Sequence, residues 1–255
     1  MIRKKSILLL KSQKGDGSGD KYDSLLNSSG FEVRQVKTLV FDFKNIDILR
    51  EELKNDDNYA GLILSSPRCV HAVYLASEDN KNILHNWKTK YNFVVGETTH
   101  KDASEKLNLE CEGRESGNAV NLSKLILKKK SLYDKPFLFP HGNLKTDTLN
   151  LELGKEGVKM EGVLVYDTIA NPNIEKELAD ATDNFTSISE YVVFFSPSGL
   201  RSSINYLRKI PLDLNDVKII AIGPVTELAI REENYKVYGV SKQPTPEEVL
   251  KLILN

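Results

Sequence analysis

The chain has 255 residues, of which 35 are Lys or Arg and 36 are Asp or Glu, so its formal net charge is −1. This balance excludes a dedicated nucleic-acid-binding protein, because such proteins carry a basic excess that displaces counterions from phosphates. The length corresponds to one large domain or two small ones. Two cysteines, Cys69 and Cys111, are too few for a disulfide framework, so we expect a reducing compartment.

We expect neither a targeting segment nor a membrane span. The apolar run that follows the basic start, Ile7–Leu10, is shorter than the core of a signal peptide, and a membrane helix needs about 20 apolar residues. We therefore expect a cytoplasmic protein. The histidines His71, His85, His100 and His141 are scattered and do not have the spacing of a metal site.

Short apolar runs alternate with amphipathic stretches along the chain. In chain order, the predicted strands are Ser6–Leu10, Glu32–Val36, Gly61–Leu64, Phe93–Val95, Phe137–Phe139, Val158–Val165, Val192–Phe195 and Lys218–Ile222. Helical patterns lie at Arg68–Ala76, Asn118–Lys128 and Pro224–Glu233, and Thr245–Glu248 forms a capping box for a last helix. Brief runs without strict alternation are typical of strands buried on both faces of a parallel sheet, so the pattern predicts an α/β fold.

The chain also echoes itself at offsets of 127 to 130 residues. The matched segments, in chain order, are Ser6–Leu10 with 136–140, Gly30–Val33 with Gly157–Met160, Ser66–Pro67 with Ser196–Pro197, 94–96 with 221–223, and Lys124–Leu127 with Lys251–Leu254. Five matches in the same order at nearly one spacing predict two copies of one α/β unit.

Four strand–helix junctions, at 62–68, 93–99, 193–200 and 219–226, share a small or hydroxyl residue directly before the helix. One such junction is more often only a good helix start, but four together favour a binding role. Free N–H groups at a helix N-terminus attract anions, and in parallel sheets these junctions lie at the carboxyl edge, where ligands bind. We therefore predict two such edges facing each other across a cleft that receives a polyanion.

Other motifs are absent or ambiguous. Gly15–Asp20 has an Asp at the third fingerprint position of a nucleotide loop, so we expect a surface loop there. The chain has no P-loop, no G-x-S-x-G elbow and no acidic cluster at a strand end, which disfavours a hydrolase and a receiver-like regulatory module. From the residues alone, Tyr166 is a packing or a catalytic residue, Arg68 pairs with an acidic group or caps its helix, and His141 is structural or a ligand.

Five segments together resemble the uroporphyrinogen-III synthase family, particularly the animal-type enzymes. They are Tyr59–Arg68, Phe137–Lys145, Val165–Thr168, Phe194–Gly199 and Ile222–Thr226, of which Phe194–Gly199 is the most specific. The resemblance implies two flavodoxin-like domains with parallel sheets, joined by a two-stranded linker. The first domain would comprise residues 1–37 and 171–255, the second 43–164, and the linker strands 38–42 and 165–170.

The resemblance also implies an activity. The family consists of lyases of haem biosynthesis that cyclise the linear tetrapyrrole hydroxymethylbilane to uroporphyrinogen III, with loss of water and inversion of ring D through a spiro intermediate. We expect no cofactor and no metal, a monomer, and transient contacts with the preceding and following pathway enzymes. Uncatalysed closure gives isomer I, so the enzyme must hold both ends of a flexible polycarboxylate in one geometry.

The resemblance assigns Tyr166 as the catalytic residue, a hydrogen-bond donor near the departing hydroxide. Two positions depart from the family pattern, because Val225 replaces a common threonine and His141 stands where a small residue is common. The alternative function is a non-catalytic two-lobed binding protein for an anionic small molecule. The expected substrate-binding residues are Ser65, Ser66, Arg68, Thr99, Gly142, Asn143, Lys145, Ser196, Ser198, Gly199, Gly223, Pro224 and Thr226.

Overall fold

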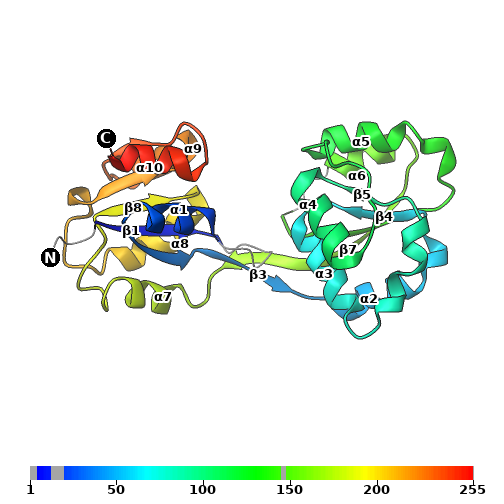
Figure 1. Cartoon of the computed structure of the whole chain (residues 1–255), viewed down its shortest axis with the longest axis horizontal. Helices are drawn as coiled ribbons and strands as arrows, with labels where there is room; N and C mark the ends of the chain where they lie inside the picture. The colour runs from blue at the N-terminus through cyan, green and yellow to red at the C-terminus, as the bar shows by residue number, and fades with distance from the viewer. Residues whose placement is uncertain (1–4, 13–19, 145–147, 255) are drawn as a thin grey trace. The chain divides into compact units, whose positions relative to one another are not determined.

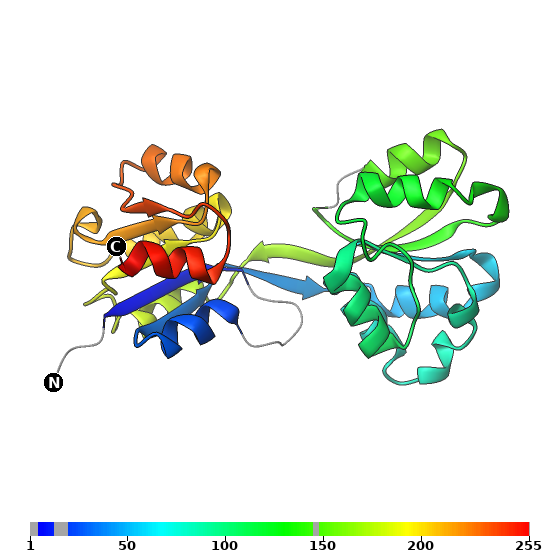
Figure 2. The same ribbon diagram turned by 45° about the horizontal axis from the view of Figure 1, so that its top comes forward.

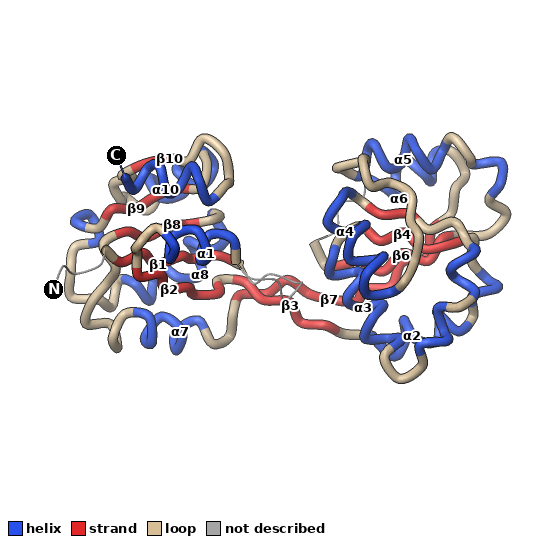
Figure 3. Tube along the Cα trace, in the orientation of Figure 1, coloured by secondary structure: helices blue, strands red, loops and turns tan. Residues whose placement is uncertain are grey.

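The structure, a computed structural model, describes residues 5–12, 20–144 and 148–254. The chain divides into two units, one formed by Met1–Val40 with Ile169–Asn255 and the other by Phe41–Thr168. Each unit contains one five-stranded sheet with helices around it (Figure 1), and Figure 3 shows the strands of each sheet flanked by helices. The predicted α/β fold with two sheets is confirmed.

The unit that contains both chain ends has the strand order β10-β9-β8-β1-β2, and all its pairs are parallel. This is the flavodoxin-like order. Its elements are β1 (Ser6–Lys11), α1 (Lys21–Ser28), β2 (Glu32–Lys37), α7 (Ile174–Ala181), β8 (Tyr191–Phe194), α8 (Pro197–Leu207), a 3₁₀ turn at Leu214–Asp216, β9 (Lys218–Ala221), α9 (Pro224–Glu232), β10 (Gly239–Val240) and α10 (Pro246–Leu254).

Side chains of β1 alternate between two cores, because successive residues of a strand point to opposite faces. Leu8 and Leu10 pack with α7, α8 and α9, whereas Ile7 and Leu9 pack with α1 and α10. Figure 2 shows α1 and α10 side by side, which agrees with their contacts. Each fully buried Leu contributes about 2 kcal/mol to folding, so continuous apolar strands favour a sheet covered on both faces.

The second unit has the strand order β3-β7-β6-β4-β5, with β4 parallel to β5 and β6, and β6 parallel to β7. Both unit boundaries fall inside paired strands, β3 and β7. The elements are β3 (Leu39–Phe43), α2 (Ile46–Lys54), β4 (Gly61–Leu64), α3 (Pro67–Ser77), β5 (Phe93–Val94), α4 (Gly96–Asp102) with a π-helical turn at Ala103–Leu107, α5 (Ala119–Leu127), β6 (Phe137–Gly142), α6 (Thr148–Lys155) and β7 (Met160–Ala170), with 3₁₀ turns at Asp56–Asn58, Lys81–Leu84, Asn86–Thr89 and Lys130–Leu132.

The sequence echo corresponds to the sheet orders. The repeat matches β4 with β8, β5 with β9 and β6 with β1. In one sheet β4 lies between β5 and β6, and in the other β8 lies between β9 and β1. The repeated Lys-Leu-Ile-Leu segment lies in α5 and α10, and each of these helices packs on the face of its sheet opposite α3 or α8. The arrangement therefore agrees with two copies of one α/β unit.

The bounds of two predicted strands and one omission need correction. β6 continues through Pro140 to Gly142. Its pairing with β4 ends at Leu138, so the proline, which has no N–H, interrupts no hydrogen bond between β6 and β4. β7 begins and ends later than predicted, at Met160 and Ala170. The two-residue strand β10 was not predicted, since so short a run has no readable pattern.

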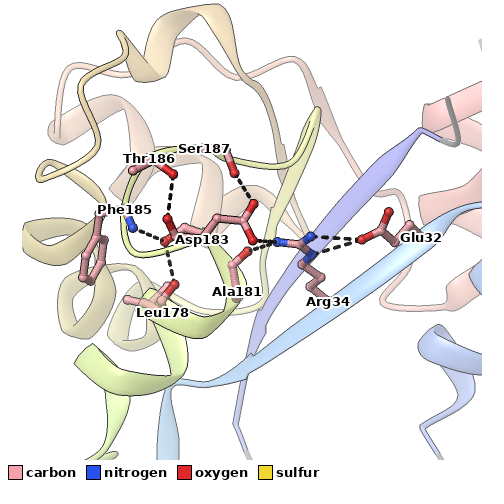
Figure 4. Close-up of polar contacts among 9 residues, drawn as sticks. Glu32, Arg34, Leu178, Ala181, Asp183, Phe185, Thr186 and Ser187 are labelled. Carbon is pink, nitrogen blue, oxygen red and sulfur yellow. Dashed lines mark hydrogen bonds and ion pairs between the residues drawn. The ribbon is translucent and has the colours of Figure 1, made fainter.

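A left-handed turn follows α7 and contains no glycine. Asp183, Asn184 and Phe185 have φ values of 50°, 58° and 61°, a conformation that costs a non-glycine residue free energy. Figure 4 shows how the turn is held: the Arg34 guanidinium donates to the Ala181 carbonyl at 2.8 Å and contacts the Asp183 carboxylate, and the Ser187 hydroxyl donates to that carboxylate at 2.6 Å. These contacts fasten the turn to β2.

None of the helices in the described part of the chain has the length and apolar composition that crossing a bilayer requires.

Candidate active site

The first turn of α8 brings together three of the predicted binding residues. Ser196 has an extended backbone, and its Oγ accepts the Gly199 N–H at 3.0 Å and lies 3.1 Å from Ser198 Oγ. Gly199 itself is buried, and a Cβ there would lie 3.0 Å from Thr38 Oγ1. The Ser196 hydroxyl therefore caps the helix, the Ser198 side chain is exposed beside it, and Gly199 packs against Thr38.

The α9 junction offers backbone donors with little side-chain competition. Gly223 is the N-cap residue and makes no side-chain cap hydrogen bond, Pro224 begins the helix, and Thr226 is only 3% exposed. The N–H groups of the first turn have no capping side chain, which is what an anion site at a helix N-terminus needs. Val225, which stands where the family pattern has a threonine, is 68% exposed, so its side chain takes no part in the core.

In the second unit, the α3 junction repeats the serine cap. Ser66 Oγ accepts the Cys69 N–H at 3.4 Å, and the Ser66 and Ser65 hydroxyls lie 3.3 and 3.7 Å from Cys69 Sγ. Burial raises the pKa of the Cys69 thiol, so this sulfur is protonated at neutral pH and is not a nucleophile. The junction is suited to binding an anion rather than to covalent chemistry.

The α4 junction is less open than the sequence predicts. Gly96, in the left-handed region with φ of 80°, donates its N–H to Ser116 Oγ and to the Gly113 carbonyl, both at 3.2 Å. Thr99 is only 2% exposed. The N–H group of Gly96, the first residue of this helix, thus already has acceptors within the protein, and the Thr99 side chain lies in the interior.

Tyr166 lies at the carboxyl end of the sheet, opposite Gly142 in the register of β6 and β7, where the register shifts between His141 and Gly142. A Cβ on Gly142 would come within 2.4 Å of Tyr166 Cζ and 2.7 Å of its hydroxyl oxygen, so the phenol lies directly against the Gly142 backbone. Asn143 donates its N–H to the Tyr166 carbonyl at 3.1 Å and accepts the Thr168 N–H at 2.9 Å.

The residues around Tyr166 have structural tasks as well. His141 donates from Nδ1 to the Gly142 carbonyl at 3.0 Å, and its ring also contacts Phe139. Gly142 and Asn143 thus contact the segment that carries Tyr166. Lys145 and most of the Gly15–Asp20 loop lie outside the described residues.

Sequence reasoning did not anticipate Phe41. The Arg68 guanidinium carbon lies 3.7 Å from the centroid of the Phe41 ring, and the Tyr166 ring meets the same ring edge-on at 5.9 Å. Among the described residues, Arg68 forms no ion pair, and its Nε is buried without a hydrogen-bond partner. Within the described residues, Arg68 therefore stacks on Phe41 and pairs with no acidic side chain. The only sequence signal is the pair of aromatic residues Phe41 and Phe43 in an otherwise unremarked extended segment.

No metal centre accompanies this arrangement in the part of the chain that the structure describes. No group of three His, Cys, Asp or Glu side chains there is placed to hold a metal ion.

Comparison with known proteins gives consistent matches along nearly the whole chain. A family model described as uroporphyrinogen-III synthase HemD matches residues 20–251. Uroporphyrinogen-III synthase from Schizosaccharomyces pombe is 26% identical over 256 residues, and that from Saccharomyces cerevisiae is 25% identical over 280 residues. Each alignment covers 98% of this chain and 96% of the relative.

Solved structures give the same picture of the fold. The crystal structure of uroporphyrinogen-III synthetase from Helicobacter pylori has a TM-score of 0.63 at 16% identity and covers 98% of both chains. A mutant uroporphyrinogen III synthase from Thermus thermophilus has a TM-score of 0.55 at 13% identity, covering 98% of this chain and 97% of that one.

Proposed function

Because the chain belongs to the uroporphyrinogen-III synthase family, we propose that Tyr166 and the helix N-termini of α3, α8 and α9 carry out the reaction of that family. The chain is a lyase of haem biosynthesis that closes hydroxymethylbilane to uroporphyrinogen III, with inversion of ring D and loss of water. The observation that supports the assignment of residues is the position of Tyr166 in β7, opposite Gly142 at the end of β6; on the other side of β6 lies β4, which is followed by the Ser66 cap of α3.

The helix N-termini supply a way to bind carboxylates without a basic surface. α3 in one unit and α8 and α9 in the other each begin with proline after a small residue, which leaves N–H groups of the first turn without helical partners. A carboxylate at such a terminus is stabilised by about 0.3–1 kcal/mol on the helix dipole alone, and more where it is partly buried. We propose that these termini bind acetate and propionate groups of the substrate, so that a chain of net charge −1 can bind a polyanion through backbone N–H groups.

Tyr166 is proposed to act on the departing hydroxyl. Cleavage of that C–O bond leaves a cationic carbon, and a hydrogen bond from the phenol to the leaving oxygen stabilises the charge that develops on it. A phenol is a weak acid at neutral pH but a good hydrogen-bond donor. Because the ring rests on Gly142 and meets the ring of Phe41 edge-on, its hydroxyl is held before substrate arrives.

Several finer assignments accompany this proposal. We propose that residues 38–42 and 165–170 act as linker strands between domains 1–37 with 171–255 and 43–164. We also propose that the protein is a cytoplasmic monomer that makes transient contacts with the enzymes before and after it in the pathway.

Turnover of freshly generated hydroxymethylbilane tests the function. We expect consumption of the linear tetrapyrrole to accelerate in proportion to protein concentration. The alternative, a two-lobed binding protein, is not favoured by the family match, and it predicts stoichiometric binding with consumption at the rate of the protein-free blank.

A further inference from the structure

The structure assigns to Phe41 the task of positioning Arg68 for substrate binding, an inference that rests on the proposed function of this site. Phe41 lies in β3 and Arg68 in the first turn of α3, and both are half-buried. At 3.7 Å from the ring centroid, the guanidinium carbon is at stacking distance. A stacked, partly desolvated Arg–aromatic pair is attractive and favours one rotamer of the long arginine side chain.

The charge held by this contact is not neutralised within the described part of the chain. The ion pairs there do not include Arg68, although most other arginines form them: Arg34 with Glu32 and Asp183, Arg50 with Asp47, Arg114 with Glu97, Arg208 with Glu233 and Arg231 with Glu227. Moreover, Arg68 Nε is buried and lacks a hydrogen-bond acceptor. A buried donor without an acceptor is unfavourable, so the guanidinium offers an approaching anionic group both an opposite charge and hydrogen-bond donors that no protein group uses.

Phe41 also fixes where that anion would lie relative to Tyr166. The Tyr166 ring meets the Phe41 ring at 90° with 5.9 Å between the centroids, so Arg68 and Tyr166 both contact Phe41. The Arg68 guanidinium carbon is therefore less than 10 Å from the centroid of the Tyr166 ring. A carboxylate of the substrate bound to Arg68 therefore holds its pyrrole ring near the phenol. Phe41 touches no reacting atom in this scheme, and it acts through Arg68 as a positioning residue.

Phe43 provides a matched control, because its ring contacts the Tyr166 ring, as Phe41 does, but not the Arg68 guanidinium. Its ring lies 6.0 Å from the Tyr166 ring and 4.9 Å from the His71 ring, and it does not stack on Arg68. Both Phe41 and Phe43 are half-buried in β3. Replacing either by Leu removes a neighbour of Tyr166, but only the change at Phe41 releases the guanidinium.

The test measures kcat and KM of Phe41→Leu, Phe43→Leu and Phe41→Tyr with hydroxymethylbilane. We expect Phe41→Leu to raise KM about tenfold, Phe41→Tyr to restore KM to within about twofold because a phenol ring also stacks, and Phe43→Leu to leave KM unchanged. Combining Phe41→Leu with Arg68→Gln should raise KM no further than Arg68→Gln alone, since both changes remove the same contact.

Three results would overturn the inference: a wild-type KM in Phe41→Leu, an equal rise of KM in Phe43→Leu, or additive effects of Phe41→Leu and Arg68→Gln. If Phe41→Leu fails to fold, an elevated KM in the folded Phe41→Tyr variant overturns it as well. Failure of the proposed function is distinguishable, because the wild-type protein would then not accelerate consumption of hydroxymethylbilane at all.

Discussion

The phenol ring of Tyr166 lies against the backbone of Gly142, so close that a Cβ at residue 142 would be 2.4 Å from Tyr166 Cζ. Glycine at this position is therefore a condition for the placement of the tyrosine. The glycine and the tyrosine come from neighbouring strands, β6 and β7, and are paired in register. A structural change at one residue must move the other.

Gly142→Ala should lower kcat about 100-fold, because the added methyl group displaces the phenol and a displacement near 1 Å costs this much in a positioned catalytic group. The melting temperature should fall only slightly, since the three atoms nearest to the added Cβ all belong to the half-exposed Tyr166 side chain, which the methyl group pushes aside without moving the backbone. Gly154→Ala is the control: nothing lies within 4 Å of its Cβ position, and a helical alanine adds stability without touching the site. A wild-type kcat in Gly142→Ala would refute the assigned role of the glycine.

Tyr166→Phe should lower kcat about 100-fold while KM and melting temperature stay close to the wild-type values, because the variant keeps the ring and removes only the donor. Tyr133→Phe is the matched control in the same unit. Its hydroxyl is buried without a partner among the described residues, so its removal should leave kcat unchanged. A large loss of melting temperature in Tyr166→Phe together with an unchanged kcat would make this tyrosine a packing residue.

The strands of the two sheets could be predicted from the sequence, but some strand ends and one turn could not. Apolar runs such as Gly61–Leu64 are strands buried on both faces, and burial is what such a pattern records. The apolar pattern alone ended this strand at Val165, because Tyr166–Thr168 are polar and paired through contacts such as Asn143 to Thr168, and only the family resemblance implied a strand at residues 165–170. The left-handed turn at Asp183–Phe185 was missed because it contains no glycine.

The site was anticipated where a local motif creates it and missed where distant segments meet. The Ser-Pro starts of α3 and α8 are properties of three or four consecutive residues, and both serines cap as predicted. Phe41 and Arg68 are 27 residues apart on a strand and a helix, and only the fold brings them together. Thr99 and Thr226 were expected to offer hydroxyls to substrate, but helical periodicity directs both into the interior.

Thr38→Val should increase the free energy of unfolding by about 1 kcal/mol, because Thr38 is fully buried and its Oγ1 lacks a hydrogen-bond partner. Thr182→Val should decrease it by about 1–2 kcal/mol, since Thr182 Oγ1 donates to the Leu178 carbonyl at 2.6 Å and accepts the Phe185 N–H at 3.2 Å. Urea titration of the two variants gives both values, and equal signs would contradict the assignment of Thr38 as unpartnered.

Asp20→Asn should cost roughly 3 kcal/mol at pH 7, because it leaves the nearly buried Lys11 ammonium without its counter-charge at 2.6 Å. Burial alone would raise the pKa of Asp20, but Lys11 and the N–H groups of Tyr22 and Asp23 outweigh it and hold the pKa below its usual value. The carboxylate therefore stabilises the fold at neutral pH, and this stabilisation is lost as pH falls below about 4.

The stability difference between wild type and Asp20→Asn should thus shrink steadily in acid, whereas Asn keeps the capping acceptor of α1. Asp213→Asn, which caps a surface turn and forms no ion pair in the described part of the chain, should show little difference at any pH. A pH-independent gap between wild type and Asp20→Asn would rule out the ion pair as its cause.

The isomer composition of the product tests the central claim most directly. Hydroxymethylbilane generated in place is incubated with the protein, the products are oxidised, and the uroporphyrin isomers are separated by chromatography. The account predicts that isomer III becomes the main product and that its fraction rises with protein concentration. Isomer I alone, in the amount found without protein, would contradict it.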